Sequence, residues 1–294
     1  MPTSQKNREG LIFAVCAAIG LGAITTQAKF VYANGGDAMT VMFVRFLCSV
    51  ILIGGFILLS GFKFSIPRSK FWGVLAIGLI WSGAMISYLA SVERISVSLA
   101  VILLYTYPLF VLLFSVLGRS LTLTPVRILF FVVAFVGLCL ALSDGALVFD
   151  QVGILLAVGA GLGAATTFIL GAKLTAEVHS VTLTFWINTV GLLMILPFVM
   201  DNSAFPSGAF AWTMLGGATL CYVVAILCQF RALTLMPAAA AAFVFNLEPL
   251  VSLLLATLVL GEILTTTQWT GVALVLGSLL FNSWDEHRQS SVSS

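Results

Sequence analysis

The sequence predicts an all-α integral membrane protein with ten transmembrane helices, arranged as two inverted five-helix repeats. Three observations support this fold class. Hydrophobic residues make up 61% of the 294 residues and charged residues only 8%, against about 25% charged in soluble domains. Residues 10–20 and 153–163 share one pattern, and basic residues collect in alternate loops. A chain of this kind has lipid rather than water as its main solvent.

Charged residues, prolines and polar clusters divide the chain into apolar segments, and crossing the hydrocarbon layer takes about 20 such residues. Barrel strands are a poor alternative, because they alternate strictly over about ten residues and these segments are longer and apolar on all sides. The loops between them are too short for a soluble domain. The predicted spans are 10–32, 38–60, 71–90, 96–117, 124–143, 150–172, 180–200, 209–232, 237–259 and 266–284.

The first and sixth spans carry the internal repeat. Gly10, Ala14, Val15, Ala17 and Gly20 recur as Gly153, Ala157, Val158, Ala160 and Gly163, a shift of 143 (153 − 10). The repeats are therefore 10–144 and 150–284, with 285–294 as a cytosolic tail. Gly159 and Gly163 have the small-xxx-small spacing of close helix contacts. Duplication around interrupted apolar helices is typical of secondary transporters.

Basic residues fall mainly on one side of the predicted membrane. With the N-terminus inside, ten of them flank the inner ends of spans and only Lys29 and Arg94 flank the outer ends, which places both termini in the cytosol. Five spans per repeat is an odd number, so the second repeat is expected to be inverted relative to the first. The ten are Lys6, Arg8, Lys63, Arg68, Lys70, Arg119, Arg127, Lys173, Arg231 and Arg288.

The second span contains Arg45 and the ninth contains Glu248. Ionisable groups at bilayer depth are costly, so each needs a reason to be there. For Arg45, a clamp on backbone carbonyls and a contact to a substrate carboxylate are both open. For Glu248 the alternatives are a protonated carboxyl that stabilises a kink, the partner of a substrate amine, and a proton carrier.

The fourth and ninth spans each contain a proline in mid-helix, Pro108 and Pro249, which match at a shift of 141 (249 − 108). A proline removes one backbone hydrogen bond and frees a carbonyl that lipid cannot satisfy. The polar side chains Tyr105, Tyr107 and Asn246 lie at the same level. A central binding site is therefore predicted at this level. The alternative is that the prolines only kink the helices so that they can pack.

Six further residues within spans form a second layer of candidates. They are Trp81 and Tyr88 on the third span, Trp186 and Asn188 on the seventh, and Tyr222 and Gln229 on the eighth. Trp81 and Trp186 could equally line a cavity or face lipid as ordinary filler.

Several function classes are disfavoured. Both histidines, His179 and His287, fall in a loop or tail, and no aspartate lies deep in a span, so no hydrolase or metal centre of known type is predicted. No Gly-rich phosphate loop with a lysine is present. The five cysteines show no CxxC spacing. We therefore expect no enzyme activity, no cofactor, no metal and no nucleic-acid partner.

Short motifs support a family resemblance. They are Phe43-Val44-Arg45-Phe46 in the second span and Leu260-Gly261-Glu262 followed by Leu264-Thr265 before the last. With two five-helix halves, the chain resembles the ten-helix, EamA-type branch of the drug/metabolite transporter superfamily, and is similar to bacterial exporters of aromatic and other amino acids. The first half echoes the last motif as Leu117-Gly118-Arg119, where Arg119 replaces the acid.

The resemblance implies a multi-pass inner-membrane protein in which spans one to four and six to nine surround a cavity. Spans five and ten pack outside it. We expect a secondary transporter that exports small metabolites, above all amino acids including aromatic or apolar ones, by alternating access with the halves rocking about a midplane site. A drug or toxic-cation exporter and a facilitative channel are the alternatives. A monomer and a weak homodimer are both compatible with the sequence.

Overall fold

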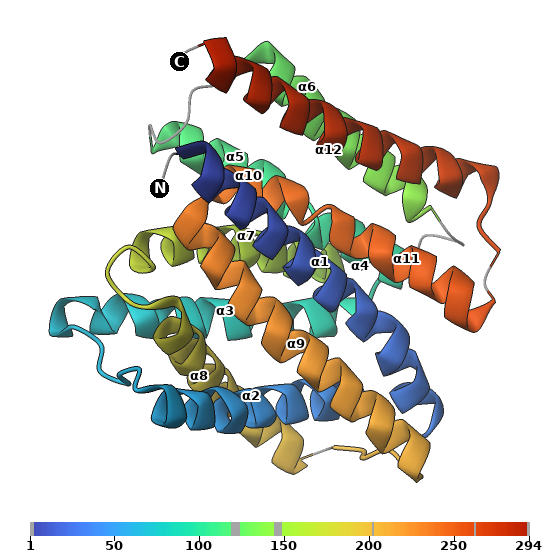
Figure 1. Ribbon diagram of the computed structural model, residues 1–294. Coiled ribbons are helices and arrows are strands. Elements are labelled where there is room, and N and C mark those ends of the chain that lie inside the picture. The colour runs from blue at the N-terminus through green and yellow to red at the C-terminus, as the bar shows by residue number, and fades with distance from the viewer. Residues whose placement is uncertain (1–2, 119–123, 144–148, 202, 262, 293–294) are drawn as a thin grey trace.

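The computed structural model describes residues 3–118, 124–143, 149–201, 203–261 and 263–292, and these form helices joined by turns and loops (Figure 1). Within these ranges there is no strand, which confirms the all-α prediction. Arg119 and Glu262, of the predicted motifs, lie outside the described residues. The helices are α1 (Thr3–Ala33), α2 (Ala38–Ser60), α3 (Phe71–Val92), α4 (Val97–Leu104), α5 (Tyr107–Leu117), α6 (Pro125–Ala141), α7 (Gln151–Leu174), α8 (Ser180–Asp201), α9 (Ala209–Leu235), α10 (Ala238–Val244), α11 (Leu247–Leu260) and α12 (Thr266–Val292), with a 3-10 turn at Arg68–Lys70.

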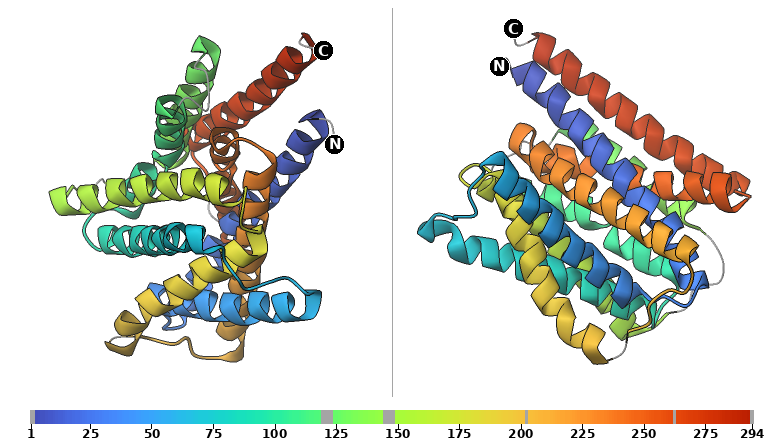
Figure 2. Two further views of the ribbon diagram at one scale, coloured as in Figure 1. Left: turned by 90° about the vertical axis from the view of Figure 1, so that its left-hand side faces the viewer. Right: turned by 60° about the horizontal axis from the view of Figure 1, so that its bottom comes forward.

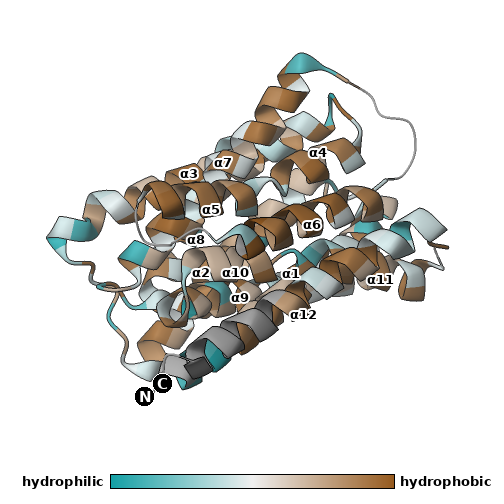
Figure 3. Ribbon diagram, turned by 90° about the horizontal axis from the view of Figure 1, so that it is seen from above, coloured by the Kyte–Doolittle hydropathy of each residue, from teal (hydrophilic) through white to brown (hydrophobic). Residues whose placement is uncertain are grey.

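Ten apolar helical segments stand where the sequence predicts spans. In the described residues, eight are long and apolar enough to cross a membrane, and two are shorter, Ile128–Ala141 and Thr266–Phe281. Hydrophobic residues cover most of the helices in Figure 3. The last helix continues to Val292, through most of the segment expected to be a tail.

The fourth and ninth spans are each built from two helices. α4 ends at Leu104 before α5 begins at Tyr107, and α10 ends at Val244 before α11 begins at Leu247. At each interruption, a side chain donates a hydrogen bond to a carbonyl of the preceding helix. Thr106 Oγ1 donates to the Leu103 carbonyl at 2.6 Å, and Asn246 Nδ2 donates to the Phe243 carbonyl at 2.8 Å. Each carbonyl also accepts a longer bond from the backbone N–H of the same residue, at 3.3 Å for Thr106 and 3.2 Å for Asn246, so side chain and backbone together satisfy the helix end.

The two interruptions differ in register from the two prolines. Thr106 corresponds to Asn246 at a shift of 140 (246 − 106), whereas the prolines match at 141. Glu248 therefore stands where the first half has Pro108. The Glu248 N–H donates to the Phe245 carbonyl at 3.0 Å, a bond that a proline cannot make.

Helices of the two halves interleave in space. The most extensive helix pairs are α1 with α9, α3 with α7, α6 with α12, and α2 with α8, each joining the first half to the second (Figures 1 and 2). The halves are therefore not two separate bundles that can rock as units. A motion about the centre has to move pairs that each contain one helix from either half.

The repeated glycines are the contact points of these pairs. A Cβ on Gly20 of α1 would lie 3.0 Å from Ala225 Cβ of α9, and one on the equivalent Gly163 of α7 would lie 2.7 Å from Ala84 Cβ of α3. Close backbone approach needs small residues. Gly159, predicted to join Gly163 in such a contact, instead has nothing within 4 Å of a Cβ built on it.

Loops tie the halves together at both ends of the bundle. At one end, which we call the Asp37 end, the Asp37 N–H donates to the Ala204 carbonyl at 3.1 Å and the Ser207 N–H donates to the Asn34 carbonyl at 2.9 Å. The opposite end carries both termini, which lie near each other in Figures 1 and 2, and we call it the termini end. There, Lys70 Nζ lies 2.6 Å from Glu177 Oε1.

Candidate functional site

A cavity of about 420 Å³ lies between helices of both halves. α1, α3, α4 and α11 supply most of its wall, and single residues of α2 and α9 reach it as well. Seven of the ten predicted binding residues and one of the two predicted kink prolines line it. They are Arg45, Trp81, Tyr88, Tyr105, Tyr107, Gln229, Glu248 and Pro249.

The cavity extends from the level of the helix interruptions to the Asp37 end. Tyr105 and Phe245 line its deep part, while the exposed residues Lys29 and Val97 line it near the Asp37 end of α1 and α4. Its wall at that end also includes Gln268, from the start of α12. Spans five and ten are otherwise peripheral, with α6 and α12 side by side at one edge in Figure 1.

The equivalent short helices α4 and α10 have different surroundings. In α4 only Ala100 is buried, whereas α10 has six buried residues among its seven. The ring of Phe243 in α10 packs 4.5 Å from that of Phe131 in α6, measured between centroids. Thus α4 lines the open cavity, whereas its equivalent α10 is buried by other helices at the termini end.

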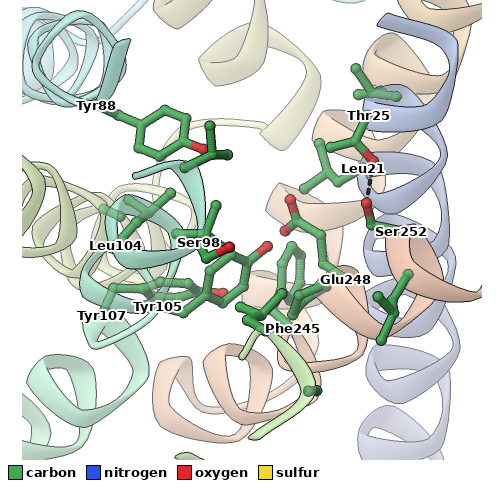
Figure 4. A pocket seen from close by; sticks show the side chains of 18 of the residues that line it. Leu21, Thr25, Tyr88, Ser98, Leu104, Tyr105, Tyr107, Phe245, Glu248 and Ser252 are labelled. Atoms are coloured by element: carbon green, nitrogen blue, oxygen red, sulfur yellow. Dashed lines mark hydrogen bonds between the residues drawn. The ribbon is translucent and has the colours of Figure 1, made fainter. Parts of the chain in front are cut away.

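The acidic side of the cavity is formed by α11 and the aromatic residues facing it. Glu248 lies in the first turn of α11, where the helix dipole favours a negative charge. Its carboxyl reaches into the cavity opposite Tyr88 and Tyr105 (Figure 4). The Tyr105 ring lies 5.7 Å from that of Tyr107, which lies 5.2 Å from that of Phe168. A carboxyl within an aromatic wall is suited to an ammonium group.

α1 packs tightly against α11 beside this carboxyl. The hydroxyls of Thr25 and Ser252 are hydrogen bonded across the two helices (Figure 4). One turn earlier, a Cβ on Gly22 would lie only 2.5 Å from the Glu248 carbonyl oxygen. Glycine at this position therefore lets α1 approach the backbone that carries the acid.

The basic side of the cavity is formed by α2, α3 and α9. The Arg45 guanidinium stacks over the ring of Tyr222, with its carbon 4.1 Å from the ring centroid. Arg45 and Glu248 do not form an ion pair in the described part of the chain. A cationic and an acidic group therefore face the same space separately.

Three predicted binding residues do not line the cavity. Trp186 Nε1 donates to the Phe64 carbonyl at 2.8 Å, which ties α8 to the loop after α2. Asn188 is fully buried, and its Nδ2 donates to the Thr184 carbonyl at 2.8 Å. Asn246 closes the end of α10, as described above. None of these three residues is therefore part of the cavity wall. Pro108, predicted as a kink residue, is buried at the start of α5 and lies outside the cavity.

Other lining residues were not predicted. Thr25, Thr26 and Ser252 are single hydroxyls in apolar helices, and such residues are too common in membrane helices to stand out. Phe168 and Phe245 are indistinguishable in sequence from lipid-facing phenylalanines. No group of His, Cys, Asp and Glu residues suited to a metal occurs among the described residues.

Comparison with known proteins assigns a family to this architecture. The EamA-like transporter family matches residues 8–143 and again residues 151–284. An uncharacterized transporter of Archaeoglobus fulgidus is 27% identical over 274 residues, covering 92% of this chain and 96% of the relative. The uncharacterized inner membrane transporter YicL of Salmonella typhimurium is 22% identical over 296 residues, covering 96% and 97%.

A solved structure described only as a crystal structure of a protein has the same fold. It superimposes with a TM-score of 0.79 at 15% identity, over 92% of this chain and 95% of that one. Together with the apolar helices, the family matches identify a multi-pass membrane protein.

Proposed function

Because the chain belongs to the EamA-like transporter family, we propose that it exports small zwitterionic metabolites, chiefly apolar and aromatic amino acids, by alternating access. The observation that carries this proposal is the pairing of Arg45 and Glu248 in one cavity with an aromatic wall. An amino acid needs a cation for its carboxylate, an acid for its ammonium group and an apolar surface for its side chain. All three are supplied in one space.

The size of the cavity supports a small solute. Binding sites for small molecules span about 300 to 1,000 Å³, and this one is about 420 Å³. The cavity ends at the helix interruptions, and buried α10 lies beyond it. A dead end of this kind favours a carrier over a facilitative channel, because a channel needs a continuous polar path.

The direction of opening follows from the distribution of basic residues. If the inner side holds the Lys and Arg excess, the termini end faces the cytosol, the repeats are inverted, and the cavity opens outward from a bacterial-type inner membrane. The different burial of α4 and α10 supports alternating access. In the opposite state, α10 would line the cavity and α4 would be covered.

Transport into proteoliposomes tests the proposal. We expect saturable exchange of radiolabelled phenylalanine or methionine that is lost in the double variant Arg45→Ala, Glu248→Gln. Trp186→Phe is the control, since Trp186 lies outside the cavity. Unchanged transport by the double variant refutes the proposal. Equal rates with and without an imposed pH gradient would remove a proton-coupling role for Glu248 and leave facilitated exchange.

Export of organic cations is a second candidate, and the aromatic surroundings of Glu248 favour it. Tyr88, Tyr105 and Tyr107 line the same wall, an arrangement that attracts quaternary ammonium groups. A cation exporter would bind tetraphenylphosphonium and would be indifferent to Arg45→Ala. An amino-acid exporter would require Arg45.

A further inference from the structure

Three buried nitrogen donors from three different helices lie in the wall of the cavity and have no hydrogen-bond partner of normal geometry. They are Arg45 Nε on α2, Trp81 Nε1 on α3 and Gln229 Nε2 on α9. The hydroxyl of Tyr222, which lies close to Arg45 and Trp81, is also unpaired. Arg45, Trp81 and Gln229 all line the cavity. Gln229 is only 1% exposed, so its amide is surrounded by protein on every side except the cavity.

Unsatisfied buried donors are rare and destabilising in native proteins. Each one has lost its hydrogen bonds to water without gaining an acceptor in the protein, so three of them in one cavity need an explanation. Among the described residues, these three are the only buried side-chain nitrogens without a partner, and the six other unpaired buried atoms are oxygens. The indole nitrogen of Trp186 and the amide nitrogen of Asn246 do have acceptors. Glu248 is the one acid among the residues that line the cavity, and it is not paired with Arg45.

We propose that Arg45, Trp81 and Gln229 form a carboxylate subsite, which reads the acid group of the substrate. The inference rests on the proposed function and deepens it, since it assigns the substrate class to compounds with a single carboxylate. A carboxylate offers two oxygens with four lone-pair directions and accepts hydrogen bonds from several donors at once. One guanidinium with two neutral N–H donors matches a charge of −1, whereas a phosphate dianion would need more positive charge.

Tyr222 acts as a positioning residue for this subsite. Its side chain is fully buried, and the edge of its ring packs against Phe46 with centroids 6.3 Å apart. The guanidinium carbon of Arg45 lies over the ring, 4.1 Å from its centroid. Stacking leaves the N–H groups in the plane of the guanidinium available to a ligand.

Binding of matched ligands to the purified full-length protein tests the subsite. The probes are L-phenylalanine, phenethylamine, which lacks the carboxylate, and 3-phenylpropionate, which lacks the amine. We expect Trp81→Phe and Gln229→Leu each to weaken phenylalanine binding about tenfold, as for a lost hydrogen bond to a charged group. Phenethylamine binding should not change, which also shows that the variants are folded.

Two controls separate ligand recognition from folding. Trp186→Phe makes the same substitution at an indole that already has a partner outside the cavity, so the ratio of phenylalanine to phenethylamine affinity should remain that of the wild type. Tyr222→Phe keeps the stacked ring and should preserve this ratio, whereas Tyr222→Leu should lower it. A ratio that is the same in Trp81→Phe, Gln229→Leu and wild type overturns the proposal.

Failure of the proposed function has a different signature. If the wild type binds neither phenylalanine nor other amino acids, amino-acid export is wrong. The subsite is then judged on 3-phenylpropionate alone. If the wild type binds 3-phenylpropionate and Gln229→Leu binds it more weakly, the carboxylate subsite is supported for another substrate. If the wild type does not bind 3-phenylpropionate, the subsite is refuted.

Discussion

Gly22 gives a sharp test of how α1 and α11 hold the acidic side of the cavity. A Cβ at this position would lie 2.5 Å from the Glu248 carbonyl oxygen and 2.8 Å from Val251 Cβ. Carbon and carbonyl oxygen approach to about 3.3 Å at closest, so Gly22→Ala must separate the helices locally by about 0.8 Å. The atoms it meets are backbone and a β-branched side chain, which have little freedom to move aside.

Overpacking of this kind costs about 1 to 3 kcal/mol, against a gain of up to about 1 kcal/mol from replacing glycine by alanine in a helix, so the net loss of stability reaches about 2 kcal/mol. We expect the melting temperature of the purified protein to fall by roughly 2 to 6 °C, and transport to fall with it because Glu248 is displaced. Gly159→Ala is the matched control, since it makes the same change in α7 with nothing within 4 Å. If both variants melt alike, the close contact of α1 with α11 is refuted.

Three further predictions concern the two ends of the bundle and are each read from thermal unfolding of the purified protein. Asp37→Ala should destabilise by about 1 to 2 kcal/mol, because Asp37 Oδ1 accepts from the Thr40 N–H at 2.6 Å and starts α2; an unchanged melting temperature would refute this role. Lys70→Ala should change stability by less than about 1 kcal/mol, since Lys70 is half-buried and its partner Glu177 is exposed, and a large loss would show that the pair holds the termini end together. Burial lowers the pKa of His179 below its ordinary value of 6.5, so the folded protein favours the neutral ring, whose Nδ1 accepts from the Val181 N–H at 3.3 Å. Stability should therefore fall as pH drops through about 6.5, and His179→Gln should remove part of that fall, whereas an identical pH profile would contradict it.

The positions of the helices could be predicted because the bilayer demands about 20 apolar residues for each. Which helices pair could not. Gly20 and Gly163 identify contact faces in the sequence, but nothing in the chain indicates that Gly20 meets α9 or that Gly163 meets α3. The same limit explains Gly159, whose spacing suits a contact although it has no neighbour. Partner choice depends on the shape of both surfaces, which a single sequence does not display.

Residues of the candidate site could be predicted where placing the side chain in lipid costs free energy. Arg45 and Glu248 stand out for that reason, and both line the cavity. Trp81 and Trp186 could not be separated, since both are tryptophans deep in apolar helices. The difference between them is the carbonyl of Phe64, which lies 122 residues before Trp186 and satisfies its indole. The contact between Tyr222 and Arg45 could not be predicted, because it depends on how α2 packs against α9.

The interleaving of the two halves also determines when the protein can fold during its synthesis. Gly20 of α1 packs against Ala225 of α9, which is made 205 residues later (225 − 20). At about 5 to 20 residues per second, α1 waits roughly 10 to 40 s in the membrane before its main partner is made. During that time the helices made first must remain inserted in the membrane without their final packing partners. A ribosome stalled before α9 would therefore hold a set of inserted helices without a finished fold.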